Sequence, residues 1–138
     1  VLNLSILIRI PEGEVGEIYR YDEKYNYDKL NYIMQIFPKD TLKEYGKDLT
    51  YVVFSILHEV GHWEYICNNN YSPQEFEEKD SIERKSFYEN NKELDAEETF
   101  WEYRKITSEK EADRYAMSEL VNALESITNS KKDEHERE

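Results

Sequence analysis

Hydrophobic and polar residues alternate at the start of the chain, over residues 2–10. The aliphatic positions of this stretch are Leu2, Leu4, Ile6, Ile8 and Ile10. Strict alternation places them on one face and predicts a half-buried β-strand, which Pro11 ends. Residues 17–21 fit a second short strand. We therefore expect a small sheet or hairpin in this part of the chain.

A helical repeat replaces the alternation from residue 27. Hydrophobic side chains recur at helical spacing over residues 27–37, up to Pro38, and again from Leu42 to about Ile66. Gly46 is a weak helix former and is the expected break within the second stretch. The helix after it, at about 48–66, is apolar on nearly its whole circumference, which predicts burial.

The second half of the chain is more polar. Residues 74–98 are dominated by Glu, Asp and Lys, which is typical of a solvent-exposed helix, and a mobile flap is the alternative. Another amphipathic helix is predicted at about 108–128, followed by a frayed or disordered polar tail over 129–138. The pattern predicts an α+β fold, with a small N-terminal sheet or hairpin packed on a mostly helical core, and a single domain over residues 1–128.

Composition narrows the class of protein. The chain has 138 residues and a net charge of −13, so it lacks the clustered positive charge that binding to nucleic-acid phosphates needs. It has one cysteine, Cys67, which excludes a disulfide within the chain and suits a reducing compartment. Its apolar stretches are too short to cross a membrane. We therefore expect a cytoplasmic protein that contacts neither nucleic acid nor membrane directly.

Candidate chemistry lies in the helix at 48–66. His58 and His62 are four residues apart, so on a helix they project from the same side and can hold one metal ion. Glu59 points about 100° away from His58 and is placed to take a proton from a metal-bound water. This H-E-x-x-H arrangement is that of zinc peptidases. The alternative is a pair of core histidines satisfied by hydrogen bonds.

A zinc peptidase needs a third protein ligand beside the two histidines. The remaining histidine, His135, lies in the polar tail, so the third ligand is expected to be a carboxylate. Glu111 is one choice, at the start of the helix at 108–128. The spacing Ser108-x-x-Glu111 also fits a capping box, in which Glu111 would only satisfy a backbone N–H. Glu97 and Glu98 are comparable rivals.

Two motifs resemble those of the ImmA/IrrE family of zinc metallopeptidases: His58-Glu-Val-Gly-His62 and Glu111-Ala-Asp-Arg-Tyr-Ala116. The resemblance covers roughly residues 42–66 and 103–121 and implies a zincin-like, gluzincin-type site in which Glu111 is the third zinc ligand. It also implies a cytoplasmic enzyme, often from a phage or mobile element, that cleaves a repressor or another regulator. Residues 68–102 then look like an insertion or flap.

The function expected from these features is a zinc-dependent endopeptidase that cleaves a cytoplasmic protein regulator. Zn²⁺ would be held by His58, His62 and Glu111, with Glu59 as general base. Tyr115 is a candidate for stabilising the oxyanion. The alternative is a protein that keeps the zinc site but acts by binding, blocking a host or regulatory protein with its acidic surface, including antirestriction by DNA mimicry.

Overall fold

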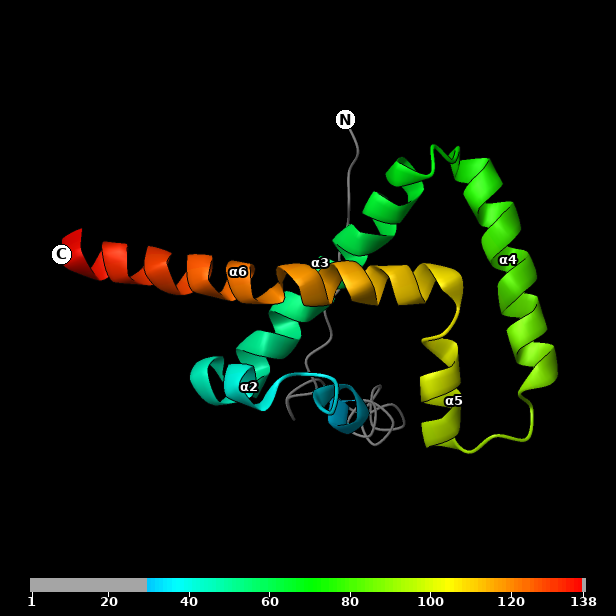
Figure 1. Cartoon of the computed structure of the whole chain (residues 1–138), viewed down its shortest axis with the longest axis horizontal. Helices are drawn as coiled ribbons and strands as arrows, with labels where there is room; N and C mark the ends of the chain where they lie inside the picture. The colour runs from blue at the N-terminus through cyan, green and yellow to red at the C-terminus, as the bar shows by residue number, and fades with distance from the viewer. Residues whose placement is uncertain (1–29, 138) are drawn as a thin grey trace, which may run out of the picture.

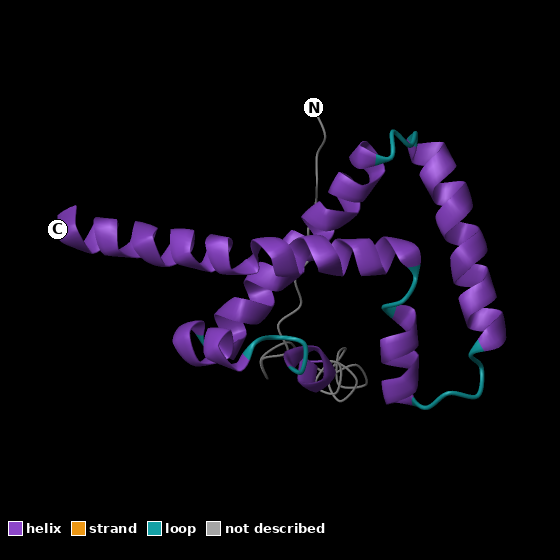
Figure 2. Ribbon diagram, in the orientation of Figure 1, coloured by secondary structure: helices purple, strands orange, loops and turns teal. Residues whose placement is uncertain are grey.

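All regular structure in the described part of the chain is helical. The computed structural model describes residues 30–137, and no strand occurs within them (Figures 1 and 2). The expected α+β fold is therefore wrong for this part of the molecule, which is an all-helical arrangement. The strands expected at 2–10 and 17–21 lie outside the described residues.

Five helices follow a short helical segment at residues 30–34. They are α2 (Lys39–Tyr45), α3 (Lys47–Asn68), α4 (Pro73–Asn90), α5 (Ala96–Tyr103) and α6 (Thr107–Arg137). Gly46 separates α2 from α3 with a φ of 82°, a left-handed conformation that favours glycine. The expected break at Gly46 is therefore confirmed, and so are the two long helices at the expected places.

The core lies where α3 and α6 cross, in the middle of the molecule (Figure 1). From α3 it takes Val53 and Phe54. From α6 it takes a stripe at helical spacing, made of Ala112, Ala116, Leu120 and Leu124, each at most 1% exposed. Burial of this stripe against α3 is the main contact between helices and sets the relative position of the two motifs.

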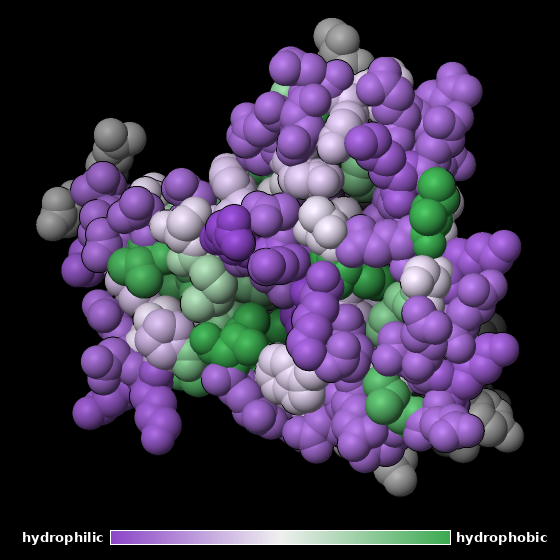
Figure 3. All heavy atoms as spheres, turned by 45° about the vertical axis from the view of Figure 1, so that its right-hand side comes forward, coloured by the Kyte–Doolittle hydropathy of each residue, from purple (hydrophilic) through white to green (hydrophobic). Residues whose placement is uncertain are grey.

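Helices α4 and α5 occupy residues 68–102, the segment expected to be an insertion. Helix α4 is polar, and Phe87 is its buried side chain, which agrees with the expected solvent-exposed helix. It runs beside the start of α6, and α5 leads from it back to that start (Figure 1). The face drawn in Figure 3 is mainly hydrophilic, with hydrophobic side chains confined to scattered groups.

Helix α6 is longer than expected. It continues to Arg137 and includes residues 129–137, for which a frayed or disordered tail was expected. Its C-terminal end extends beyond the other helices (Figure 1). Among the described residues, no helix combines the length and the apolar character that a membrane span requires.

Candidate metal centre

His58 and His62 face each other on α3. Their Nε2 atoms are 3.1 Å apart, and the ring planes are nearly perpendicular, at 89°. Both side chains are largely buried, with 13% and 19% exposed. The buried Nδ1 of His62 has no hydrogen-bond partner within the described part of the chain. Two ring nitrogens that meet at this distance can share at most one proton, so the pair is well suited to sharing a cation instead.

Glu109 brings a carboxylate from α6 to this pair. Its Oε2 lies 2.9 Å from the Nε2 of His58 and 3.5 Å from the Nε2 of His62. The residue is 6% exposed. Burial raises the pKa of the Glu109 carboxyl, but hydrogen bonds from the two histidines and from Arg84 outweigh it and hold the pKa well below its usual range. The carboxylate is therefore ionised at neutral pH.

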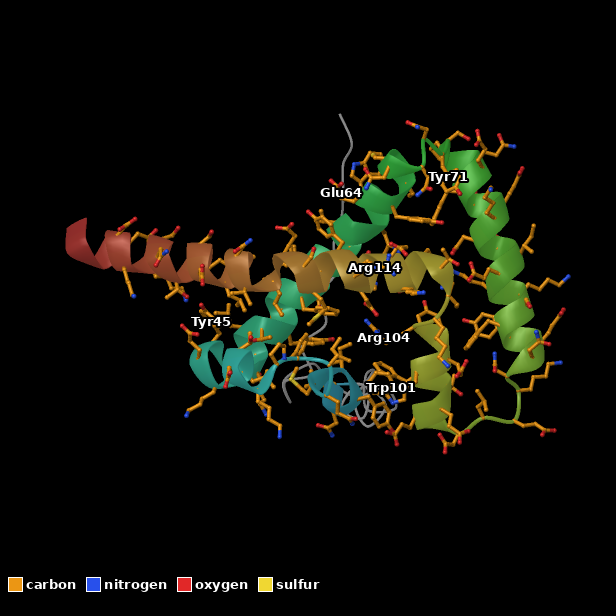
Figure 4. All side chains as sticks on the ribbon, in the orientation of Figure 1. Tyr45, Glu64, Tyr71, Trp101, Arg104 and Arg114 are labelled. Atoms are coloured by element: carbon orange, nitrogen blue, oxygen red, sulfur yellow. The ribbon has the colours of Figure 1, made fainter. Side chains whose placement is uncertain are left out.

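A second carboxylate, Asp113, orients His58 from the other side of its ring. The Nδ1 of His58 lies 2.8 Å from the Oδ1 of Asp113. Arg104 holds Asp113 in place, donating from Nε to Oδ2 at 2.8 Å and from Nη2 to Oδ1. Figure 4 shows Arg104 where α5 meets α6. A histidine that donates one ring N–H to a carboxylate presents its other nitrogen as a fixed lone pair, as metal-bound histidines do.

These contacts set the charge of His58. Burial lowers the pKa of its ring, but hydrogen bonds to Asp113 and Glu109 outweigh burial and raise the pKa to about 9. Without a metal ion, the protonated ring donates to one carboxylate on each side. A metal ion that binds the Nε2 of His58 must displace this proton.

Gly61 permits the close approach of the two helices. A Cβ added there would lie 2.7 Å from the carbonyl oxygen of Ala112 and 2.9 Å from its Cα. Because both are backbone atoms, they cannot move aside as a flexible side chain would. Gly61 lies between the two histidines in the chain, so the contact that needs a glycine also brings α6 within reach of them.

The donor set fits a zinc ion. Tetrahedral zinc with ligands at about 2.0 Å has ligand atoms about 3.3 Å apart. The three distances among the Nε2 atoms of the histidines and the Oε2 of Glu109 are 3.1, 2.9 and 3.5 Å. Two imidazoles and one carboxylate are also the ligand types of hydrolytic zinc sites. The residues present can therefore hold the ion that the H-E-x-x-H motif predicts.

Glu59 lies next to this group. One of its carboxylate oxygens is within 4.8 Å of ligand atoms of both histidines, and the residue is exposed. Glu59 could itself complete a three-residue metal group. The Oε2 of Glu109 lies at the spacing of a zinc ligand from both histidines, and Glu109 is buried, so Glu109 is the better third ligand. Glu59 is left accessible to water.

The other carboxylates named from the sequence lie elsewhere. Glu111 pairs with Arg114 at 3.1 Å and lines a groove of about 510 Å³ with Gly61 and Tyr115. In Figure 4, Arg114 lies on α6 near the crossing. Within residues 30–137, no hydrogen bond or ion pair joins Glu111 or Tyr115 to either histidine.

The rival carboxylates, Glu97 and Glu98, both lie in the first turn of α5. Glu98 forms a capping box there with Asp95, so its carboxylate satisfies the start of a helix. The structure thus brings Glu109 to the histidines in place of the carboxylates proposed from spacing.

A signal in the sequence could have found Glu109. It precedes the buried stripe of α6 by one turn, three residues before Ala112 and seven before Ala116. At about 100° per residue, Glu109 falls on the stripe, whereas Glu111 lies about 160° around the helix from Glu109. The same periodicity puts Asp113 beside Glu109. The capping box proposed for Ser108 and Glu111 is also absent, because α6 begins at Thr107 and Ser108 lies inside it. The Ser108 hydroxyl donates to Asp80 of α4.

No protein-family model, curated protein or solved structure matches this chain. The geometry of the α3–α6 site is therefore the basis for assigning a function.

Proposed function

We propose that the chain is a zinc-dependent peptidase whose metal ligands are His58, His62 and Glu109. The observation that carries this proposal is the meeting of three donor atoms, from two helices, at the spacing of a tetrahedral zinc site. A zinc ion held by these residues would lower the pKa of a bound water to about 7 and so would supply a nucleophile at neutral pH.

Glu59 is the general base in this proposal. Its carboxylate is exposed and close to both histidines, so it can accept the proton of the attacking water and pass it to the leaving amine. Asp113 and Arg104 keep the ring of His58 in one orientation throughout. Glu109 supplies a negative charge that offsets the charge of the ion.

Peptide hydrolysis is the favoured reaction because of the motif as a whole. His58-Glu-Val-Gly-His62 combines two ligands and a base in one helical turn, as zinc peptidases do. The similarity to ImmA/IrrE proteins supports a protein regulator in the cytoplasm as the substrate. The assignment of Glu109 departs from what that similarity implies, which is Glu111 as the ligand.

Metal binding tests the ligand set. Zinc affinity, measured by competition with a chromophoric chelator, is expected to fall at least about 100-fold in Glu109→Gln, since losing a ligand costs more than losing a neighbour that orients one. Glu111→Gln is the matched control, because that carboxylate pairs with an exposed arginine. Equal losses in the two variants, or absence of stoichiometric zinc in the wild-type protein, would contradict the proposal.

Proteolysis is tested separately with Glu59→Gln. Wild-type protein and the variant, both loaded with zinc, are incubated with a complex peptide library, and new termini are identified by mass spectrometry. Cleavage is expected in the wild type and is expected to fall at least about 100-fold in the variant, with unchanged zinc content. If the variant binds zinc and its biological effect is intact, the protein acts by binding, and the acidic-surface alternative replaces the peptidase.

A further inference from the structure

Helix α4 is joined to the metal centre by one side chain, Arg84. All three nitrogens of its guanidinium are in use. Nε donates to Asp80 at 2.6 Å, Nη1 to the hydroxyl of Tyr103 at 2.8 Å, and Nη2 to Glu109 at 2.8 Å and Ser108 at 3.2 Å. The side chain is 25% exposed. These four hydrogen bonds leave the guanidinium from three nitrogens in one plane, an arrangement that the ammonium of lysine cannot reproduce, so the contact is specific for arginine.

The two oxygens of Glu109 have separate partners. Oε1 accepts from Arg84 and, at 3.1 Å, from the hydroxyl of Tyr103. Oε2 faces the two histidines. Two donors on one oxygen oppose rotation of the carboxylate and keep it from presenting both oxygens to the same ion. A single oxygen is therefore held in the position of a ligand before any metal binds.

Asp80 and Glu83 reinforce this contact from the same helix. Asp80 binds Arg84 and also accepts from Ser108. Glu83 accepts from the backbone N–H of Thr107 at 2.7 Å and from its hydroxyl at 2.9 Å, which caps the start of α6 from outside the helix. Helix α4 therefore determines the position of Glu109, in the first turn of α6, both through its side-chain contacts and by capping the start of α6.

We propose that Arg84 is a positioning residue that holds Glu109 with one oxygen toward the histidines, so that the metal affinity of the site depends on helix α4. This inference rests on the proposed zinc ligand set. It gives the segment at 68–102 a role in building the centre, in place of the flap over it that the sequence suggested. Arg84 touches neither substrate nor metal in this role and acts only through Glu109.

The test must separate geometry from charge, because removing a cation near a metal site favours metal binding by electrostatics alone. Arg84→Lys keeps the charge and loses the planar fork. Zinc affinity is expected to fall about tenfold, within the range seen when partners of metal ligands are removed. The absorption bands of the Co²⁺-substituted protein are expected to shift as the carboxylate reorients. Arg114→Lys, at an exposed ion pair of α6, is the matched control and is expected to change neither readout.

A double-mutant cycle shows whether Arg84 acts through Glu109. In a Glu109→Gln background, Arg84→Lys is expected to have no further effect on zinc affinity. Tyr103→Phe removes the weaker donor to the same oxygen and is expected to lower affinity about threefold, with less risk to folding.

The outcomes also separate the two proposals. Tight zinc binding by the wild type, with an unchanged affinity in Arg84→Lys or additive losses in the cycle, would overturn the role of Arg84 and leave the ligand set standing. Failure of the wild-type protein to bind zinc would overturn both.

Discussion

The crossing of α3 and α6 and the attachment of α4 rest on different physical forces. The crossing is held by apolar burial and by backbone contact at Gly61, where no side chain larger than hydrogen fits. Helix α4 buries Phe87 and places Phe76 against Tyr65 of α3, and it is otherwise attached through charged and polar side chains, notably Asp80, Glu83 and Arg84. Apolar burial depends only weakly on NaCl concentration and pH, whereas partly exposed ion pairs are sensitive to both.

This difference indicates which part of the metal centre is rigid. The histidines belong to the crossing, so their position follows from packing. The carboxylate of Glu109 lies on the crossing helix but takes its orientation from α4. Changes at the crossing should therefore destabilise the whole protein, and changes at α4 should alter the centre while leaving the fold intact.

The largest effect is expected for Gly61→Val. Its Cβ would overlap backbone atoms of Ala112, so the helices must separate, at a cost of about 4 kcal/mol in the free energy of unfolding. Urea unfolding of the zinc-free protein measures this loss of unfolding free energy. Ile82→Val on α4, where the side chain is 72% exposed, is the control and should stay within about 0.5 kcal/mol. Similar costs at both sites would refute the contrast between the two regions.

The pH dependence of the zinc-free protein is the next largest effect. The folded-state pKa of His58, about 9, is above its ordinary value of 6.5, so protonation favours the folded state. The stabilisation, about 3 kcal/mol, is complete below pH 6.5 and is lost as pH rises through 9. Denaturant unfolding across this range, with a chelator present, should show the decline.

Asp113→Asn checks the cause of this pH dependence. It removes the carboxylate that binds the Nδ1 of His58, so the decline in unfolding free energy between pH 6.5 and 9 should become shallower. A decline as steep as that of the wild type would assign the titration to another group.

A smaller effect is expected for Glu83→Ala on α4. This change leaves the N–H of Thr107 without its partner and should cost about 1 kcal/mol, as the loss of a helix cap does. Thermal unfolding measures this loss of stability. Glu89→Ala, at an exposed position of the same helix, is the control. Equal melting temperatures for the two variants would rule out a capping role for Glu83.

The smallest effect is expected from salt. Raising the NaCl concentration to about 1 M screens partly exposed ion pairs and should weaken the attachment of α4 by a few tenths of a kcal/mol. Amide hydrogen exchange should then quicken in α4 and stay constant in α3 around Val53. Uniform acceleration across both helices would show that they unfold as one unit.

Much of the described fold follows from hydrophobic periodicity. The helices on either side of Gly46, the polar helix within 74–98 and the long final helix were all predicted, because helical period and breakers are local properties of the chain. The α+β fold was wrong for residues 30–137, where the regular structure is helical. The charged tail at 129–137 was assigned to disorder on composition, yet it continues α6, whose helical geometry is already established upstream.

The sequence by itself determined that His58 and His62 lie on one side of a helix, since four residues make about one turn. The helical period of the final helix also puts Glu109 on its buried face, whereas the motif resemblance pointed to Glu111. Only the tertiary structure decided that this face contacts the histidines. It also decided that Arg84 and Arg104 hydrogen-bond to the carboxylates on this face. Such contacts join residues between 9 and 55 positions apart. Those between α3 and α6 depend on how closely the two helices approach at Gly61, which no local pattern records.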